Sequence, residues 1–175
     1  MRVNIRLWAL VFVLIAGVSF ACSLPVEETE PTKAEVMVQN EPRQLPSFAM
    51  TDVSGNAVNL SALKGRKVFV NLWATWCPPC RAEIPSIEEL ADKTDRHEVI
   101  FVMLSLDKSF DIARQFATAR KMKVPIYYPA EKLPALFNID GIPATFIFDE
   151  QGNLVKQVNG SDDYSKTSYV DLLTK

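Results

Sequence analysis

The 175-residue sequence predicts an α/β layered domain, and three observations support this fold class. Two nearly continuous apolar runs, at residues 68–73 and 98–105, are typical of strands that are covered on both faces, as in a mostly parallel sheet. Apolar residues recur at helical spacing after each run. A pair of strands around a tight turn follows near the C-terminal end, at residues 145–149 and 154–158.

The other elements follow from local patterns. Residues 48–52 and 57–60 flank Ser54-Gly55-Asn56, which predicts a hairpin. The helix after the first apolar run has one apolar face, and Glu83, Glu88 and Glu89 lie largely off it; the face consists of Ile84, Ile87, Leu90 and Ala91. The remaining expected elements are a second helix around 112–117 with Ser109 as N-cap, a short strand at 126–128, a short helix at 131–137 and a closing helix within 163–173.

The N-terminal residues are expected to form an export signal and are excluded from the fold. Arg2 and Arg6 precede an uncharged apolar or small run at residues 7–21. This run is shorter than the ~20 residues of a spanning helix, so a cleaved signal over 1–21 is favoured, and an uncleaved anchor stays open. Either arrangement exports the rest of the chain.

Cys22 follows this run directly. Ser19-Phe20-Ala21-Cys22 resembles a bacterial lipoprotein signal, although that pattern prefers an aliphatic residue at Ser19 and a small one at Phe20. We therefore expect Cys22 to be lipidated, with a buried cysteine in an anchor helix as the alternative. Prolines and glutamates then predict a flexible linker over 22–46, and the rest of the chain, 47–175, is expected to be one domain.

Composition excludes several classes of function. The formal net charge of −2 supplies no basic field for nucleic acid. Three cysteines and one histidine, His97, are too few for a zinc site.

The motif Trp76-Cys77-Pro78-Pro79-Cys80 lies between an apolar strand and a helix. The chain has no second cysteine pair for zinc, and Arg81 stands where haem attachment needs histidine. The remaining interpretation is a redox dithiol at a helix N-terminus, where unpaired N–H groups favour a thiolate. A purely structural disulfide is disfavoured, since closing so short a loop removes little chain entropy. No cofactor or metal is expected beyond this dithiol.

The two prolines also predict how strongly the first thiolate is stabilised. If Cys77 is the N-cap, Pro79 has no N–H to offer, and only Cys80 can donate from the backbone. We therefore expect a Cys77 pKa nearer ~7 than ~3.5 and a dithiol that donates electrons.

Residues 70–85, VNLWATWCPPCRAEIP, closely resemble the active-site segment of TlpA/ResA-like thioredoxin-fold proteins. The resemblance extends from about Leu45 to Asn159 and includes Gly141-Ile142-Pro143-Ala144-Thr145-Phe146. It implies a thioredoxin fold with a central mixed sheet flanked by helices and an N-terminal β-hairpin extension. It also implies a membrane-tethered bacterial protein whose domain lies outside the cytoplasm, in the periplasm or on the extracytoplasmic face.

The resemblance further implies roles for single residues. Cys77 would be the exposed nucleophile and Cys80 the resolving thiol. Pro143 would be cis and lie against the dithiol, and Ile142 would offer backbone pairing to an extended partner. Trp76 would shield one side of the site, with simple core packing as the alternative.

Two positions depart from ordinary thioredoxin. Asn71 stands where thioredoxin has a buried aspartate, so that general base is missing. Glu83 stands where ResA-like proteins place an active-site acid, one helical turn from Cys80. The alternative for Glu83 is a solvated first-turn residue favoured by the helix dipole. Pro85 is expected to kink the helix.

The expected function is thiol–disulfide exchange, in which the protein reduces disulfides of exported proteins, apocytochrome c among them, after recharging by a transmembrane thiol donor. A peroxiredoxin would need threonine at Ala74. A Sco-type copper chaperone would need three residues between its cysteines and a distant histidine, whereas this chain has two residues between and only His97.

Overall fold

The computed structural model describes residues 43–175. The predicted export signal, Cys22 and most of the predicted linker lie outside the described residues. Within residues 43–175, no helix has the length and apolar character needed to cross a membrane.

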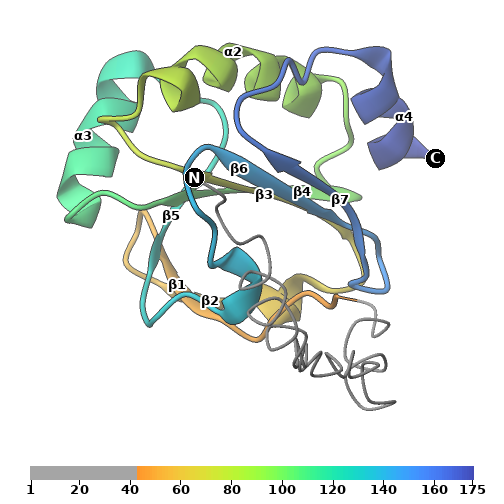
Figure 1. Ribbon diagram of the computed structural model, residues 1–175, viewed down its shortest axis with the longest axis horizontal. Helices are drawn as coiled ribbons and strands as arrows, with labels where there is room; N and C mark the ends of the chain where they lie inside the picture. The colour runs from red at the N-terminus through yellow and green to blue at the C-terminus, as the bar shows by residue number, and fades with distance from the viewer. Residues whose placement is uncertain (1–42) are drawn as a thin grey trace, which may run out of the picture. The chain divides into compact units, whose positions relative to one another are not determined.

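The domain is built on a single mixed sheet of seven strands in the order β2-β1-β5-β4-β3-β6-β7 (Figure 1). Strand β4 lies in the middle of the sheet and is parallel to both of its neighbours, β5 and β3, whereas β3 is antiparallel to β6. The hairpin β1–β2 extends the sheet by pairing β1 antiparallel to β5, which confirms the predicted N-terminal extension. The strands are β1 Ala49–Asp52, β2 Ala57–Asn59, β3 Lys67–Trp73, β4 Val99–Ser105, β5 Ile126–Pro129, β6 Ala144–Phe148 and β7 Leu154–Asn159.

The helices cover the two faces of the sheet unequally. The three α-helices, α2 Pro78–Asp92, α3 Phe110–Arg120 and α4 Thr167–Thr174, lie on one face (Figure 1). The opposite face is closed by two 3-10 turns, η1 Leu60–Leu63 and η2 Ala135–Phe137, which bury Leu60 and Phe137 there. The predicted flanking helices are therefore present on one face only.

Strict alternation along β3 divides the buried residues into two layers. Val68, Val70 and Leu72 point to the face of the 3-10 turns and join a cluster made only of apolar residues, which we call the apolar layer. Phe69 and Trp73 point to the other face and pack with residues of α2, α3 and α4 in the helix-side layer. Because β3 is an interior strand with a buried layer on each face, both of its faces are covered, which explains its continuous apolar run.

Two local expectations need correction. The helix expected at 131–137 is only the 3-10 turn η2, because Pro134 has no N–H and disfavours helical geometry at the preceding residue. Ser109 occupies the N-cap of α3 as expected, but its side chain makes no capping hydrogen bond.

The ordered domain begins before residue 47. Leu154 N donates to Arg43 O at 2.7 Å, and Leu45 N donates to Gly152 O at 2.7 Å. The Leu45 side chain is buried against the apolar layer. The last residues of the predicted linker therefore belong to the folded domain.

Candidate active site

The cysteine motif forms the start of helix α2, where the sequence places it. Cys77 is the N-cap, with prolines at the first two helical positions, and its Sγ accepts a hydrogen bond from Cys80 N at 3.2 Å. Cys77 and Cys80 form a disulfide with a Cα–Cα distance of 5.3 Å. The predicted arrangement, in which Cys80 alone supplies a backbone donor from the first turn, is thus confirmed.

The accessibility of the motif differs from the expectation. Cys77 is only 3% exposed in the disulfide form and Cys80 is fully buried, so the description of Cys77 as exposed is wrong for this state. Pro78 and Pro79 are exposed beside it, and Trp76 is 63% exposed. Core packing is therefore excluded for Trp76, which lies on the surface next to the disulfide.

The Ile142–Pro143 segment reaches the dithiol through Ile142, and its peptide bond is cis, as the resemblance implied. The Ile142–Pro143 peptide bond is cis, and the Ile142 carbonyl oxygen lies 3.8 Å from Cys77 Sγ. In the reduced protein a Cys77 thiol at this distance has a carbonyl to which it can donate. Gly160 N donates to Pro143 O at 2.9 Å and fixes this loop from the other side.

Glu83 is a buried member of the helix-side layer. Its side chain is 2% exposed, and its Oε1 accepts from Asn71 Nδ2 at 2.8 Å. It lies in the second turn of α2, since the first turn contains no acidic residue. The interpretation as a solvated first-turn glutamate is therefore wrong, and so is its assignment to the polar side of the helix.

Burial raises the pKa of Glu83 above its ordinary value of 4.5, because the charged form loses its hydration. Hydrogen bonds from Asn71 Nδ2 and from Asp162 N, the latter to Oε2 at 3.3 Å, oppose this rise by favouring the carboxylate. The result is a carboxyl group that can change protonation state closer to neutral pH than an exposed glutamate.

Asn71 connects Glu83 to a chain of neutral polar groups. Its Nδ2 also donates to Thr145 Oγ1 at 2.9 Å, and Thr145 Oγ1 lies 2.6 Å from Tyr164 Oη. Burial raises the pKa of Tyr164, so its hydroxyl stays neutral. The sequence reasoning assigned no role to Thr145 or Tyr164, although a lone threonine in an apolar strand was an available signal.

A second buried carboxylate, Asp107, organises the loop that precedes the cysteines. Thr75 donates to it twice, from its backbone N at 3.2 Å and from Oγ1 at 2.7 Å, and Ser105 Oγ donates at 2.8 Å. Asp107 is 4% exposed. The sequence reasoning missed it, and its position at the end of a buried strand was the available signal.

The Redoxin family profile matches residues 40–173 of the chain. Thioredoxin-like protein YneN of Bacillus subtilis is 38% identical over 123 residues, which cover 69% of this chain and 72% of YneN. Thiol-disulfide oxidoreductase ResA of Bacillus thuringiensis is 31% identical over 119 residues, which cover 67% of this chain and 69% of ResA.

Two solved structures share the fold. StoA from Bacillus subtilis superposes with a TM-score of 0.60 at 25% identity, covering 72% of this chain and 99% of StoA. A thiol:disulfide interchange protein of the thioredoxin family from Chlorobium tepidum superposes with a TM-score of 0.66 at 27% identity, covering 75% of this chain and 96% of the other. The sheet, the dithiol at the start of α2 and these relatives agree: the chain belongs to the Redoxin family, as a thioredoxin-fold protein of the TlpA/ResA type.

Proposed function

We propose that the protein is a thiol–disulfide oxidoreductase that reduces disulfides in other, exported proteins through Cys77 and Cys80. The observation that carries this proposal is the disulfide at the N-terminus of α2, beside the cis Ile142–Pro143 bond. The protein relatives that carry the name thiol-disulfide oxidoreductase support it.

In the proposed reaction, the Cys77 thiolate attacks one sulfur of the substrate disulfide and releases the other substrate sulfur as a thiolate. The Cys80 thiolate then attacks Cys77 Sγ, which breaks the mixed disulfide and releases the second substrate thiolate. Two electrons pass from the dithiol to the substrate, whose thiolates take up protons. The Cys77–Cys80 disulfide remains, and a thiol donor must reduce it before the next turnover.

Glu83 is proposed to handle the proton of Cys80. The two residues are one helical turn apart on α2, and both are buried. The position of the aspartate base of thioredoxin is occupied here by Asn71, which cannot accept a proton, so Glu83 is the nearest candidate base. The Glu83 carboxylate would accept the Cys80 proton before the second step and return it when a donor reduces the disulfide. Its raised pKa suits this exchange, because a base works best when its pKa approaches the working pH.

The N-cap of α2 supports the proposed direction of electron flow, from the dithiol to the substrate. One backbone N–H, that of Cys80, reaches Cys77 Sγ in the first turn. A thiolate with so few donors is weakly stabilised, and a weakly stabilised reduced form corresponds to a low reduction potential. Equilibration of the pair with a dithiol buffer is expected to give a potential near about −270 mV; a value near about −120 mV would identify an oxidant instead.

The partners and the location belong to the same proposal. Exported compartments are oxidising, so a reductant there needs continual recharging. A transmembrane thiol donor would supply the electrons, and apocytochrome c is one candidate acceptor.

Lipidation of Cys22 would hold the domain at the membrane. In that case Cys22→Ser releases the domain to the soluble fraction. Unchanged membrane association with an unchanged N-terminus would instead favour an uncleaved helix.

The test of the proposed activity is reduction of insulin disulfides by the purified protein with dithiothreitol as electron source. The wild-type protein is expected to accelerate precipitation of the insulin B chain, and Cys77→Ser to abolish the acceleration. Mixed disulfides trapped in cells by Cys80→Ser then identify the acceptor. Failure of the wild-type protein to accelerate insulin reduction would refute the proposal.

A further inference from the structure

The segment between β7 and α4 crosses the active site. We call residues 160–164 the strap, because hydrogen bonds join it to three parts of the site. Gly160 N donates to Pro143 O at 2.9 Å, and Ser161 Oγ donates to Pro79 O at 3.5 Å. Asp162 N donates to Glu83 Oε2 at 3.3 Å. The strap thus spans from the cis-proline loop over the start of α2 to Glu83.

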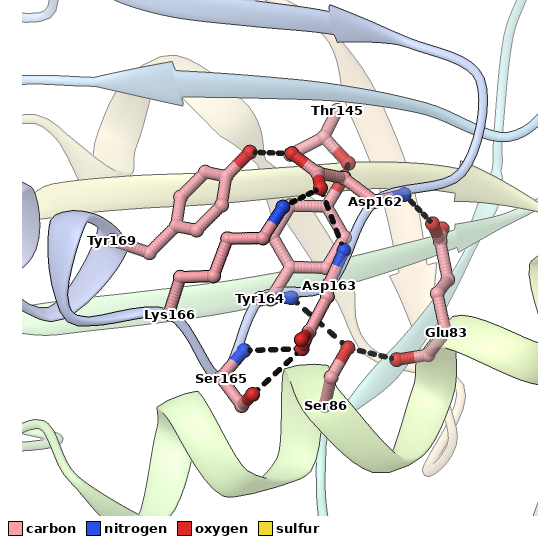
Figure 2. A network of polar contacts seen from close by, with 9 residues as sticks. All are labelled: Glu83, Ser86, Thr145, Asp162, Asp163, Tyr164, Ser165, Lys166 and Tyr169. Atoms are coloured by element: carbon pink, nitrogen blue, oxygen red, sulfur yellow. Dashed lines mark hydrogen bonds and ion pairs between the residues drawn. The ribbon is translucent and has the colours of Figure 1, made fainter.

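The strap continues its contact with α2 beyond Glu83. Tyr164 N donates to Ser86 Oγ at 3.1 Å, and Ser86 Oγ donates to Glu83 O at 2.8 Å (Figure 2). Figure 2 shows the Asp162 backbone N facing the Glu83 carboxyl, with the strap running along the helix. Glu83 is 2% exposed although Ser161 next to it is at the surface, so the strap is a thin cover over the carboxyl.

A polar cluster fastens this cover to α4. The Asp162 carboxylate accepts from Lys166 Nζ at 2.5 Å and from the Tyr169 hydroxyl (Figure 2). These bonds lower the pKa of Asp162 to about 2, so the carboxylate is charged throughout the working range. The Tyr169 ring is itself held, since Lys156 Nζ lies 4.4 Å from its centroid. We call Asp162, Lys166 and Tyr169 the clamp.

We propose that Asp162 is a positioning residue for the redox reaction: through the clamp it holds the strap closed over Glu83 and keeps that carboxyl dehydrated. This inference rests on the proton-handling role proposed for Glu83. A loosened strap would admit water to Glu83. Because burial is the largest cause of the raised pKa of Glu83, hydration would lower that pKa.

The groups that face Glu83 act on its pKa in both directions. Asp162 from the strap adds a negative charge, which also raises the pKa of Glu83, while its backbone N–H opposes the rise. Tyr164 from the strap and Tyr169 from α4 are neutral hydroxyls with raised pKa values. Asn71 from β3 is a neutral donor whose hydrogen bond favours the carboxylate and so lowers the pKa of Glu83. Cys80 precedes Glu83 by three residues on α2 and carries no charge in the disulfide. Asp162→Asn keeps the backbone donor, removes the charge and weakens the clamp, so both of its effects lower the pKa of Glu83.

The test compares Asp162→Asn with Asp163→Asn in the full chain. The control removes the same charge from the neighbouring residue, whose carboxylate bonds only to Ser165 within the segment and not to α4. The pKa of Glu83 is followed by carboxyl NMR, and the rate of disulfide exchange is measured against pH. In Asp162→Asn, the pKa of Glu83 and the matching inflection of the rate profile are expected to move to lower pH. Exchange near neutral pH should slow by at most about tenfold for each unit the pKa falls, because a weaker base accepts the Cys80 proton less readily. Asp163→Asn should match the wild type.

Tyr169→Phe provides a second variant that loosens the clamp without changing any charge, and it should move the pKa of Glu83 in the same direction by less. An unmoved pKa in both clamp variants, or equal movement in Asp163→Asn, would overturn the inference. Glu83→Gln separates this outcome from failure of the proposed function. If Glu83→Gln exchanges at the wild-type rate, the role of Glu83 is wrong, yet the NMR measurement still decides whether the clamp controls its hydration.

Discussion

The two buried layers of the sheet differ in what they contain. Among residues 43–175, no buried polar residue lies in the apolar layer. The helix-side layer, together with the loop that follows β4, holds the buried polar residues of the domain, which are Asn71, Glu83, Ser105, Asp107 and Thr145. Among residues 43–175, the two buried side-chain atoms without a hydrogen-bond partner, Asn71 Oδ1 and Trp73 Nε1, also belong to the helix side of β3.

This difference indicates a division of labour across one strand. Burying polar groups costs free energy unless every group is hydrogen-bonded. The helix-side layer, which contains the polar residues of the active site, therefore contributes less to stability per residue. The apolar layer has no such cost and can stabilise the domain by packing alone. Mutation of a polar residue on the helix side should therefore mainly lower the exchange rate, whereas mutation of its neighbour in the apolar layer should mainly lower the free energy of unfolding. The following experiments test this expectation.

The largest effect is expected at the dithiol. Cys77→Ser should abolish disulfide reduction, because the attacking thiol is lost and the remaining thiol, Cys80, is fully buried, whereas Cys80→Ser should accumulate mixed disulfides that cannot be resolved. Mass spectrometry of adducts formed with a substrate disulfide measures the difference. Equal accumulation on both variants would overturn the assignment of Cys77 as nucleophile and Cys80 as resolving thiol.

Glu83→Gln should slow exchange near neutral pH by about 10²–10⁴-fold while leaving the fold intact, because proton transfer by a positioned side chain typically accelerates a reaction by this factor. Stopped-flow measurement of exchange from about pH 5 to about pH 9 provides the test. Glu88→Gln, on a half-buried position of the same helix whose carboxylate accepts from Lys123 N, is the matched control and should leave the rate unchanged. A flat profile shared by wild type and Glu83→Gln would assign Glu83 a structural role only.

Leu72→Ala tests the apolar layer at the residue next to Asn71. Leu72 is fully buried in that layer, and its truncation should lower the free energy of unfolding by about 2–5 kcal/mol. Urea titration measures the loss. The exchange rate per folded molecule should stay at the wild-type value, and a large loss of rate in the folded variant would show that the two layers are not independent.

The smallest effect concerns pH. The pKa of Glu83 is higher in the folded protein than its ordinary value of 4.5, so its contribution to stability is fully present below about pH 4.5 and is lost as pH rises through the folded pKa. Wild type should therefore lose stability relative to Glu83→Gln as pH rises above about 4.5. Parallel unfolding midpoints across this range would contradict the raised pKa.

Features that depend on local chain order were predictable. The N-cap of α2 follows from a cysteine followed by two prolines, and the central strands follow from uninterrupted apolar runs. The cis bond at Pro143 came from family resemblance, because most X–Pro bonds are trans.

Features that depend on distant segments were not predictable. The burial of Glu83 depends on Asn71 and on Asp162, which lies 79 positions away, and helical periodicity alone assigned Glu83 to the polar side. The low accessibility of Cys77 depends likewise on Ile142, 65 positions away. Trp76, in contrast, is more exposed than a tryptophan in the core would be. Its neighbours along the chain do not distinguish a surface tryptophan from a buried one.

The pairing of Arg43 and Leu45 with the turn between β6 and β7 has a mechanical consequence. This turn lies at the Lys67 end of β3, where Gly65 N donates to Glu150 O, whereas the disulfide follows the Trp73 end. Lys67 and Trp73, the first and last residues of β3, are about 20 Å apart, at ~3.3 Å per residue. Tension applied to the polypeptide at Arg43 would therefore act first on its hydrogen bonds with the β6–β7 turn. The dithiol, at the opposite end of β3, would remain free to contact a bulky partner.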